Sequence, residues 1–163
     1  MIPRIIHQVW LGGKNIPDNF LILQEKLLEL HTNWEYKLWT EESIEQDSLC
    51  SKKQYDHAAF AGQSNLVRLY ALKKYGGIYL DFDFDVLKSF DSLLDCSAFV
   101  AKQPDGVYCN AFIGSIKEHR WINDMLANYG NPKHNDPAWG CHIIKKYISN
   151  DVTEYPTFVL LTE

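Results

Sequence analysis

The segment YGGIYLDFDFDV, residues 75–86, constrains the fold more than any other part of the sequence. It is an apolar run that ends in three aspartates alternating with two phenylalanines. Residues two apart in a strand point to the same face. An extended chain would therefore place Asp81, Asp83 and Asp85 on one side and the two rings on the other. The pattern predicts a buried strand that carries carboxylates about 6–7 Å apart to its carboxyl end.

Strand and helix patterns alternate along the rest of the chain. Short β-branched or alternating runs predict strands, and amphipathic runs predict helices. Strands are predicted at 4–10, 34–39, 78–81, 98–101 and 109–113, with a short one near 86–87; helices are predicted at 20–30, from Thr40, and at about 57–75, 119–129 and 139–148. This order indicates an α/β fold, with a sheet between helices.

Composition narrows the class of protein. A chain of 163 residues with 46% hydrophobic and 23% charged residues suits one globular domain, here residues 1–163. The net charge of −5 lacks the basic patch of a nucleic-acid binder, so we expect no nucleic-acid partner. The four cysteines show no metal-site spacing, and no apolar run approaches about 18 residues. We therefore expect a soluble, cytoplasmic protein with free thiols.

The aspartates need a partner if they lie together. Ligands of open α/β sheets bind at the carboxyl ends of the strands, which is where Asp81 and Asp83 fall. Neighbouring carboxylates repel one another unless a cation or a donor lies between them, and Mg²⁺ or Mn²⁺ would serve. The alternative is an exposed edge strand that uses charge against aggregation. An EF-hand is excluded, because Val86 and Ser92 stand where glycine and glutamate are required.

The helix before the acidic strand carries a polar pair on one face. Asn65 and Arg68 are three residues apart, and apolar residues surround them. A buried arginine requires an anionic partner. We expect Arg68 to pair with an aspartate of the next strand, with an anionic or hydroxyl-rich ligand, or with both.

Four stretches carry a resemblance: IPRIIHQVW, WEYKLWTEE, AGQSNLVRLYALKKYGGIYLDFDFDVLKSFDSLL and YCNAFIGS. Over residues 2 to about 115 the chain resembles the DXD sugar-transferase family (glycosyltransferase family 32). That family includes yeast mannosyltransferases and bacterial capsule or lipooligosaccharide enzymes, and the clostridial glucosylating toxins are distant relatives. The resemblance implies a GT-A fold, a Rossmann-like mixed sheet flanked by helices. It also implies a nucleotide-sugar donor, with UDP favoured over GDP, and Mn²⁺ or Mg²⁺ as cofactor.

The resemblance also assigns roles to the acidic strand and its helix. Asp83 would ligate the metal on the diphosphate. Asp81 would join the metal shell and approach the ribose or the donor sugar. Arg68 would line the donor site and hold the sugar or the diphosphate. Asp83, Asp81 and Arg68 are thus the expected catalytic residues.

Four further residues are matched to the donor site by the same resemblance. Trp10 would stack on the base, with a core tryptophan as the alternative, and Tyr79 would line the site. Asn110 would contact the sugar. Asn65 stands where most of the family carries an aspartate that accepts hydrogen bonds from sugar hydroxyls. Its amide oxygen can still accept, but the charge is lost.

The expected function is that of a retaining glycosyltransferase with a saccharide acceptor, acting in capsular or lipopolysaccharide synthesis. Through that acceptor we expect peripheral association with the inner face of a membrane. Relatives usually continue into a tail bearing His and Trp, so the chain is interpreted as C-terminally truncated or as a reduced relative. Two alternatives stay open: a non-catalytic nucleotide-sugar-binding subunit and a phosphatase with a D-x-D motif.

Overall fold

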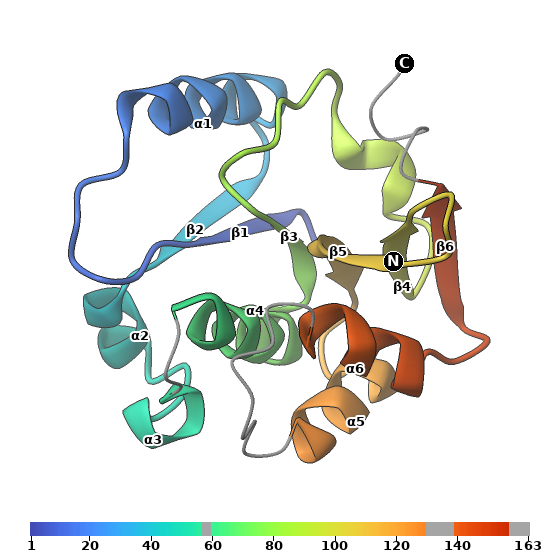
Figure 1. Cartoon of the computed structure of the whole chain (residues 1–163). Coiled ribbons are helices and arrows are strands. Elements are labelled where there is room, and N and C mark those ends of the chain that lie inside the picture. Colours follow the sequence, from blue (N-terminus) through green and yellow to red (C-terminus); the bar gives the residue numbers. More distant parts are fainter. Residues whose placement is uncertain (57–59, 130–138, 157–163) are drawn as a thin grey trace.

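The strands form one mixed sheet with the order β2-β1-β3-β5-β4-β6 (Figure 1). The computed structural model describes residues 1–56, 60–129 and 139–156. The strands are β1 (Ile5–Val9), β2 (Glu35–Trp39), β3 (Gly77–Leu80), β4 (Ala98–Lys102), β5 (Tyr108–Ser115) and β6 (Val152–Pro156). β1 runs parallel to β2 and β3, whereas β5 runs antiparallel to β3 and β4. The carboxyl ends of β1 and β3 and the amino end of β5 therefore meet at one edge.

Helices cover both faces of this sheet. They are α1 (Asp18–Leu30), α2 (Glu41–Asp47), α3 (Lys52–Tyr55), α4 (Phe60–Tyr75), α5 (Arg120–Asn128), α6 (Trp139–Tyr147) and the 3-10 helix η1 (Phe90–Leu93). Figure 1 shows α4, α5 and α6 on one face, while α1 and the segment that leads to η1 lie over the other. Each face has its own apolar core, and β3 serves both: Tyr79 joins one, Ile78 and Leu80 the other. A strand buried on both faces has this nearly continuous apolar sequence.

Two glycines make the connection between α4 and β3 possible. Gly76 and Gly77 have φ angles of 67° and 103°, in the left-handed region that favours glycine. A Cβ on Gly76 would lie 2.6 Å from the backbone nitrogen of Lys117, and one on Gly77 would lie 2.5 Å from the carbonyl oxygen of Ile5. The chain can therefore pass directly from the helix that carries Arg68 to the strand that carries Tyr79.

A buried histidine ties β1 to its two neighbouring strands. His7 is fully buried, and its Nε2 lies 2.8 Å from the carbonyl oxygen of Gly76. Trp39 donates from its indole nitrogen to His7 Nδ1 at 3.1 Å. A neutral ring protonated on Nε2 satisfies both hydrogen bonds. Burial lowers the pKa of His7 to about 4, so the ring stays neutral at pH 7. His7 is structural.

The acidic segment differs from its predicted form. β3 ends at Leu80, and a turn at Phe82 and Asp83 follows, so the three aspartates do not share a strand face. The cause is burial of the Phe82 ring, which packs edge-on against Trp10 with 5.3 Å between centroids. The prediction of a short strand at 86–87 was wrong for the same reason, because the chain leaves the sheet here.

The other predicted strands and helices are found within a few residues of their predicted bounds. Residues 57–59 of the predicted helix at 57–75 lie outside the described residues. β6, α3 and η1 were not predicted. Across the described part of the chain, no helix has the length and apolar character needed to span a bilayer.

Candidate functional site

A pocket opens at the edge of the sheet where β1 and β3 end, and we call it the strand-end pocket. Its volume is about 430 Å³, which falls within the roughly 300–1,000 Å³ common for small-molecule sites. All seven residues predicted for the site line it: Trp10, Asn65, Arg68, Tyr79, Asp81, Asp83 and Asn110. The structure thus brings together side chains from both ends of a stretch of about a hundred residues.

Strand direction explains why these residues meet. Trp10 follows β1, and Asp81 and Asp83 follow β3, so the parallel pair delivers them to one edge. Asn110 lies near the start of β5, which is antiparallel to β3 and therefore begins at that same edge. The backbone N–H of Asp81 donates to the carbonyl oxygen of Ala111 at 2.9 Å, which fixes this register.

Arg68 is the centre of a buried charged network. Its Nη2 lies 3.1 Å from Asp81 Oδ1 and 3.2 Å from the hydroxyl of Tyr79, while its Nη1 donates to the carbonyl oxygen of Asn110. The Arg68 side chain is only 5% exposed, whereas that of Asp81 is 37% exposed. The arginine therefore has the internal anionic partner that its sequence context predicts, and it also lines the pocket.

Tyr79 supports the same ion pair. Its hydroxyl donates to Asp81 Oδ1, and its ring lies 4.2 Å from the guanidinium carbon of Arg68. Burial raises the pKa of Tyr79 well above its usual value, so the phenol keeps its proton and remains a donor. One oxygen of Asp81 thus receives two donors, and its orientation is fixed before any ligand arrives.

Asp83 has no such internal partner. It is exposed at the pocket, and it makes no hydrogen bond or ion pair within residues 1–56, 60–129 and 139–156. In that same part of the chain, Oδ2 of Asp81 is also without a partner, and no group of three or more His, Cys, Asp or Glu could hold a metal ion. Two carboxylates with free oxygens nevertheless fit Mg²⁺ or Mn²⁺, which take one or two carboxylates and complete their shell with phosphate and water. The donor set therefore fits the implied cation.

The third aspartate belongs elsewhere. Asp85 forms an ion pair with Lys26 of α1 and lines a different pocket, on the other side of the acidic segment. It follows the turn that contains Phe82 and Asp83. Asp85 is therefore not part of the strand-end pocket.

Trp10 forms an aromatic wall of the pocket. It is half-buried, which argues against the core-tryptophan alternative. Its indole nitrogen donates to the carbonyl oxygen of Lys14 at 2.7 Å, and Phe20 and Phe82 pack edge-on against its ring. Phe20, Phe82 and the exposed Phe60 line the pocket too, and sequence reasoning missed all three as site residues.

The two asparagines are hydrogen-bonded to each other behind the pocket. Asn110 Nδ2 donates to Asn65 Oδ1 at 2.8 Å, so the oxygen predicted to accept from a sugar hydroxyl already accepts from the protein. Gly140 of α6 packs against this pair, because a Cβ there would lie 2.0 Å from Asn110 Nδ2. The absence of a side chain at Gly140 lets α6 support the pocket from behind.

Comparison with known proteins gives the family. Residues 17–100, just over half of the chain, match the family described as the glycosyltransferase sugar-binding region containing a DXD motif. Inositol phosphoceramide mannosyltransferase 3 of Schizosaccharomyces pombe is 34% identical over 132 residues, which cover 78% of this chain. The chain spans only 37% of the length of that relative.

Solved structures give the fold. The PaToxG glycosyltransferase has a TM-score of 0.67 and 21% identity, and the match covers 90% of this chain and 69% of that one. The UDP-bound glycosyltransferase domain of the YGT toxin has a TM-score of 0.54 and 10% identity, with 78% and 61% covered. The mixed sheet flanked by helices is thus the GT-A fold. With the match to the family description, these findings show that the chain belongs to the DXD-containing glycosyltransferase family.

Proposed function

We propose that the strand-end pocket binds a nucleotide-diphosphate sugar and that the chain transfers the sugar, with retention of configuration, to an acceptor hydroxyl. The observation that carries this proposal is the convergence of four groups on one pocket: the exposed carboxylate of Asp83, the partly exposed carboxylate of Asp81, a buried arginine and a half-buried tryptophan. Such a set suits a ligand that has a flat base, a diphosphate and a polyol.

Each side chain has a role in this proposal. Trp10 stacks on the base of the donor, which is uracil in a UDP-sugar and guanine in GDP-mannose. Asp81 and Asp83 hold Mn²⁺ or Mg²⁺, which when bound offsets the charge of the departing diphosphate as a Lewis acid. Arg68, held by Tyr79 and Asp81, keeps the donor sugar in a fixed orientation toward the acceptor.

Among the described residues that line the strand-end pocket, no carboxylate is free to act as a covalent nucleophile. Within that set the carboxylates are Asp81, held by Arg68 and Tyr79, and Asp83, assigned to the cation. We therefore propose front-side attack by the acceptor hydroxyl, with its proton passing to the departing phosphate oxygen. The bond from the anomeric carbon to that oxygen breaks as the new glycosidic bond forms.

The acceptor is proposed at the level of chemical class. The relative's name, inositol phosphoceramide mannosyltransferase, supports mannose as the donated sugar and a lipid headgroup as the acceptor. The alternative acceptor is a saccharide, in capsular or lipopolysaccharide synthesis. We also propose that the protein acts in the cytoplasm, at the inner face of a membrane.

Calorimetric titration with UDP, GDP, UDP-glucose and GDP-mannose, with and without Mn²⁺, tests the donor site. Asp83→Asn should weaken Mn²⁺-dependent nucleotide binding by more than about tenfold, because it removes a free ligand oxygen and its charge. Its free energy of unfolding should change by less than about 0.5 kcal/mol, because Asp83 has no internal partner.

Asp95→Asn is the matched control, since Asp95 is exposed, lies outside the pocket and makes no hydrogen bond or ion pair within the described residues. Equal affinity of both variants, or full sugar transfer in excess EDTA, would refute the metal role. Binding without transfer or donor hydrolysis would favour the non-catalytic subunit. Release of phosphate from simple phosphomonoesters would favour the phosphatase.

A further inference from the structure

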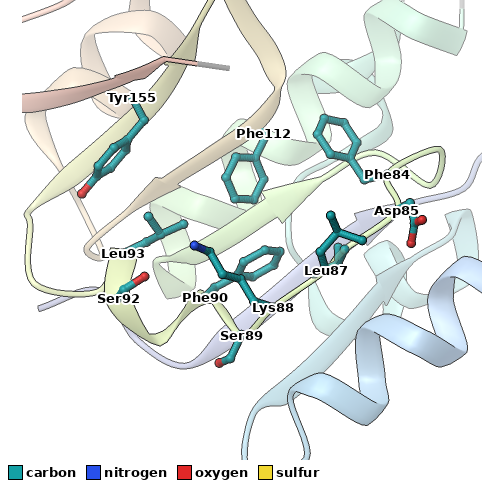
Figure 2. A pocket seen from close by; sticks show the side chains of 11 residues that line it. Phe84, Asp85, Leu87, Lys88, Ser89, Phe90, Ser92, Leu93, Phe112 and Tyr155 are labelled. Carbon is teal, nitrogen blue, oxygen red and sulfur yellow. The ribbon is translucent and has the colours of Figure 1, made fainter. Parts of the chain in front are cut away.

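A second pocket, which we call the apolar pocket, adjoins the strand-end pocket. The acidic segment separates the two, since Asp83 lines the first and Phe84 lines the second. The apolar pocket has a volume of about 270 Å³ and lies between residues 84–93, β5 and β6. Figure 2 shows the apolar side chains that surround it: Phe84, Leu87, Phe90, Leu93, Phe112 and Tyr155.

The polar side chains that line the apolar pocket differ in whether they have a partner within the protein. Asp85 is neutralised by Lys26, and Ser89 is hydrogen-bonded to Asp91. Lys88 is exposed, and in the part of the chain that the structure describes it makes no hydrogen bond or ion pair. In Figure 2 its amine extends across the pocket, on the same side as Leu93. As far as the described residues line it, the pocket thus combines an apolar interior with one free cation.

This combination restricts the occupant. A peptide would bury amide groups among side chains that offer few free partners, which is costly. A neutral hydrocarbon would fill the apolar interior but would make no contact that uses the exposed ammonium of Lys88. An anionic amphiphile uses both features, because its chain fills the apolar interior while its headgroup meets the cation.

We propose that the apolar pocket binds the hydrocarbon chain of an anionic amphiphile whose phosphate lies against Lys88, and that this amphiphile is the acceptor. The identification as acceptor rests on the proposed function. Its support is the shared wall, because the consecutive residues Asp83 and Phe84 line the strand-end pocket and the apolar pocket respectively. The single pocket of about 270 Å³ suits one chain.

Calorimetric titration with dodecyl phosphate below its micelle concentration tests the binding step. Dodecyl maltoside is the neutral comparison with the same chain, and inorganic phosphate is the comparison without a chain. Dodecyl phosphate should bind most tightly and inorganic phosphate should not bind measurably. Equal binding of dodecyl phosphate and inorganic phosphate would overturn the proposal.

Two variants test the pocket itself. Leu87→Asp should weaken dodecyl phosphate binding by at least about tenfold, because it replaces an apolar lining side chain with a negative charge that the hydrocarbon cannot contact favourably and that repels the phosphate. Lys88→Gln should weaken it about two- to fivefold, as expected for an exposed ion pair, and should leave dodecyl maltoside binding unchanged. Leu87 is 52% exposed, so its replacement should leave the fold intact.

Matched controls lie outside the pocket. Ile22, 65% exposed on α1, is the control for Leu87, and Lys117, exposed and without a partner among the described residues, is the control for Lys88. Ile22→Asp and Lys117→Gln should bind dodecyl phosphate like the wild type. If they weaken it as much as the pocket variants do, the binding is not at this pocket and the proposal fails.

The same titrations separate this proposal from the donor site. Leu87→Asp should keep its Mn²⁺-dependent nucleotide affinity, and Asp83→Asn should keep its affinity for dodecyl phosphate. Absence of nucleotide binding in the wild type would refute the proposed function and the identification of the amphiphile as acceptor, but not the binding of the amphiphile. Loss of amphiphile binding with intact nucleotide binding would refute only the apolar pocket.

Discussion

Two buried polar networks connect the central strands, and they differ in whether their hydrogen-bonding capacity is used up. At His7, a neutral ring donates to Gly76 and accepts from Trp39, so both ring nitrogens are satisfied. At Arg68, a charged group meets Asp81 and Tyr79, yet its Nε is buried without a partner among the described residues. The first network only holds strands together. The second keeps charge and free oxygens available at the strand-end pocket.

The difference between the two networks indicates which of them can bind a ligand. A saturated neutral network gains nothing from a ligand, because every donor and acceptor is already paired. A partly exposed ion pair beside a free carboxylate does gain, because a cation and a phosphate can complete it. The three changes that follow would break or sharpen this contrast, in order of decreasing expected effect on stability.

Arg68→Met should have the largest effect. Breaking a buried ion pair typically costs about 3–5 kcal/mol, and the partial exposure of Asp81 places the expected loss of unfolding free energy at about 3–4 kcal/mol. Lys102→Met is the control, because its partner Glu154 and Lys102 itself are both more than a third exposed, so the loss should be much smaller than for Arg68→Met. Urea unfolding measures both. Equal losses would show that burial of Arg68 does not matter.

Lowering the pH should have the second-largest effect on stability, through His7. The folded-state pKa of His7 is about 4 against an ordinary value of 6.5, so between these values the unfolded chain binds a proton that the folded chain does not. Stability is therefore complete above pH 6.5 and falls as the pH is lowered toward 4, by about 3 kcal/mol in total. Burial lowers the pKa values of His31 and His119 as well, which adds loss of the same sign.

Urea titrations at pH 7.5, 6, 5 and 4 measure this dependence. His7→Gln, which cannot be protonated, should flatten the profile while lowering stability at pH 7.5. If the unfolding free energy of that variant still falls with decreasing pH as steeply as in the wild type, groups other than His7 cause the acid sensitivity.

Gly140→Ala should have the smallest effect of the three on stability. It should also affect the donor site indirectly, through Asn110. The new methyl group would meet Asn110 Nδ2 at 2.0 Å, and the cost of overpacking, reduced by the better helix propensity of alanine, is about 1–2 kcal/mol. Displacement of Asn110 toward the strand-end pocket should also weaken nucleotide-sugar binding. In a double-mutant cycle with Asn110→Ala the two losses should not add, because the clash disappears. Strict additivity would contradict direct contact.

Much of the fold could be predicted from local patterns. β1, β3, α4 and their Gly76-Gly77 junction lie close to their predicted positions, because burial on both faces imposes continuous apolar runs and tight turns require glycine. β6 was missed although Val152, Thr153 and Tyr155 favour a strand, because a segment of five residues that ends in proline is ambiguous until it pairs with β4, some fifty residues earlier.

The candidate site, too, could be predicted only in part. Asp81, Asp83 and Arg68 stand out in the sequence, because like charges in a row and an enclosed arginine both require partners. Phe20 and Phe60 give no such signal, since an exposed aromatic residue is ordinary until the fold brings it to a pocket.

The order of strands and helices, and the presence of carboxylates at the end of a buried strand, were determined by the sequence itself. Only the tertiary structure decided which of the three aspartates line the strand-end pocket and which lines the apolar pocket. Burial of the Phe82 ring against Trp10 ends the strand, and the ion pair with Lys26 draws Asp85 to the other pocket. Both partners are distant in sequence, and a local pattern cannot encode a contact that exists only after the chain has folded.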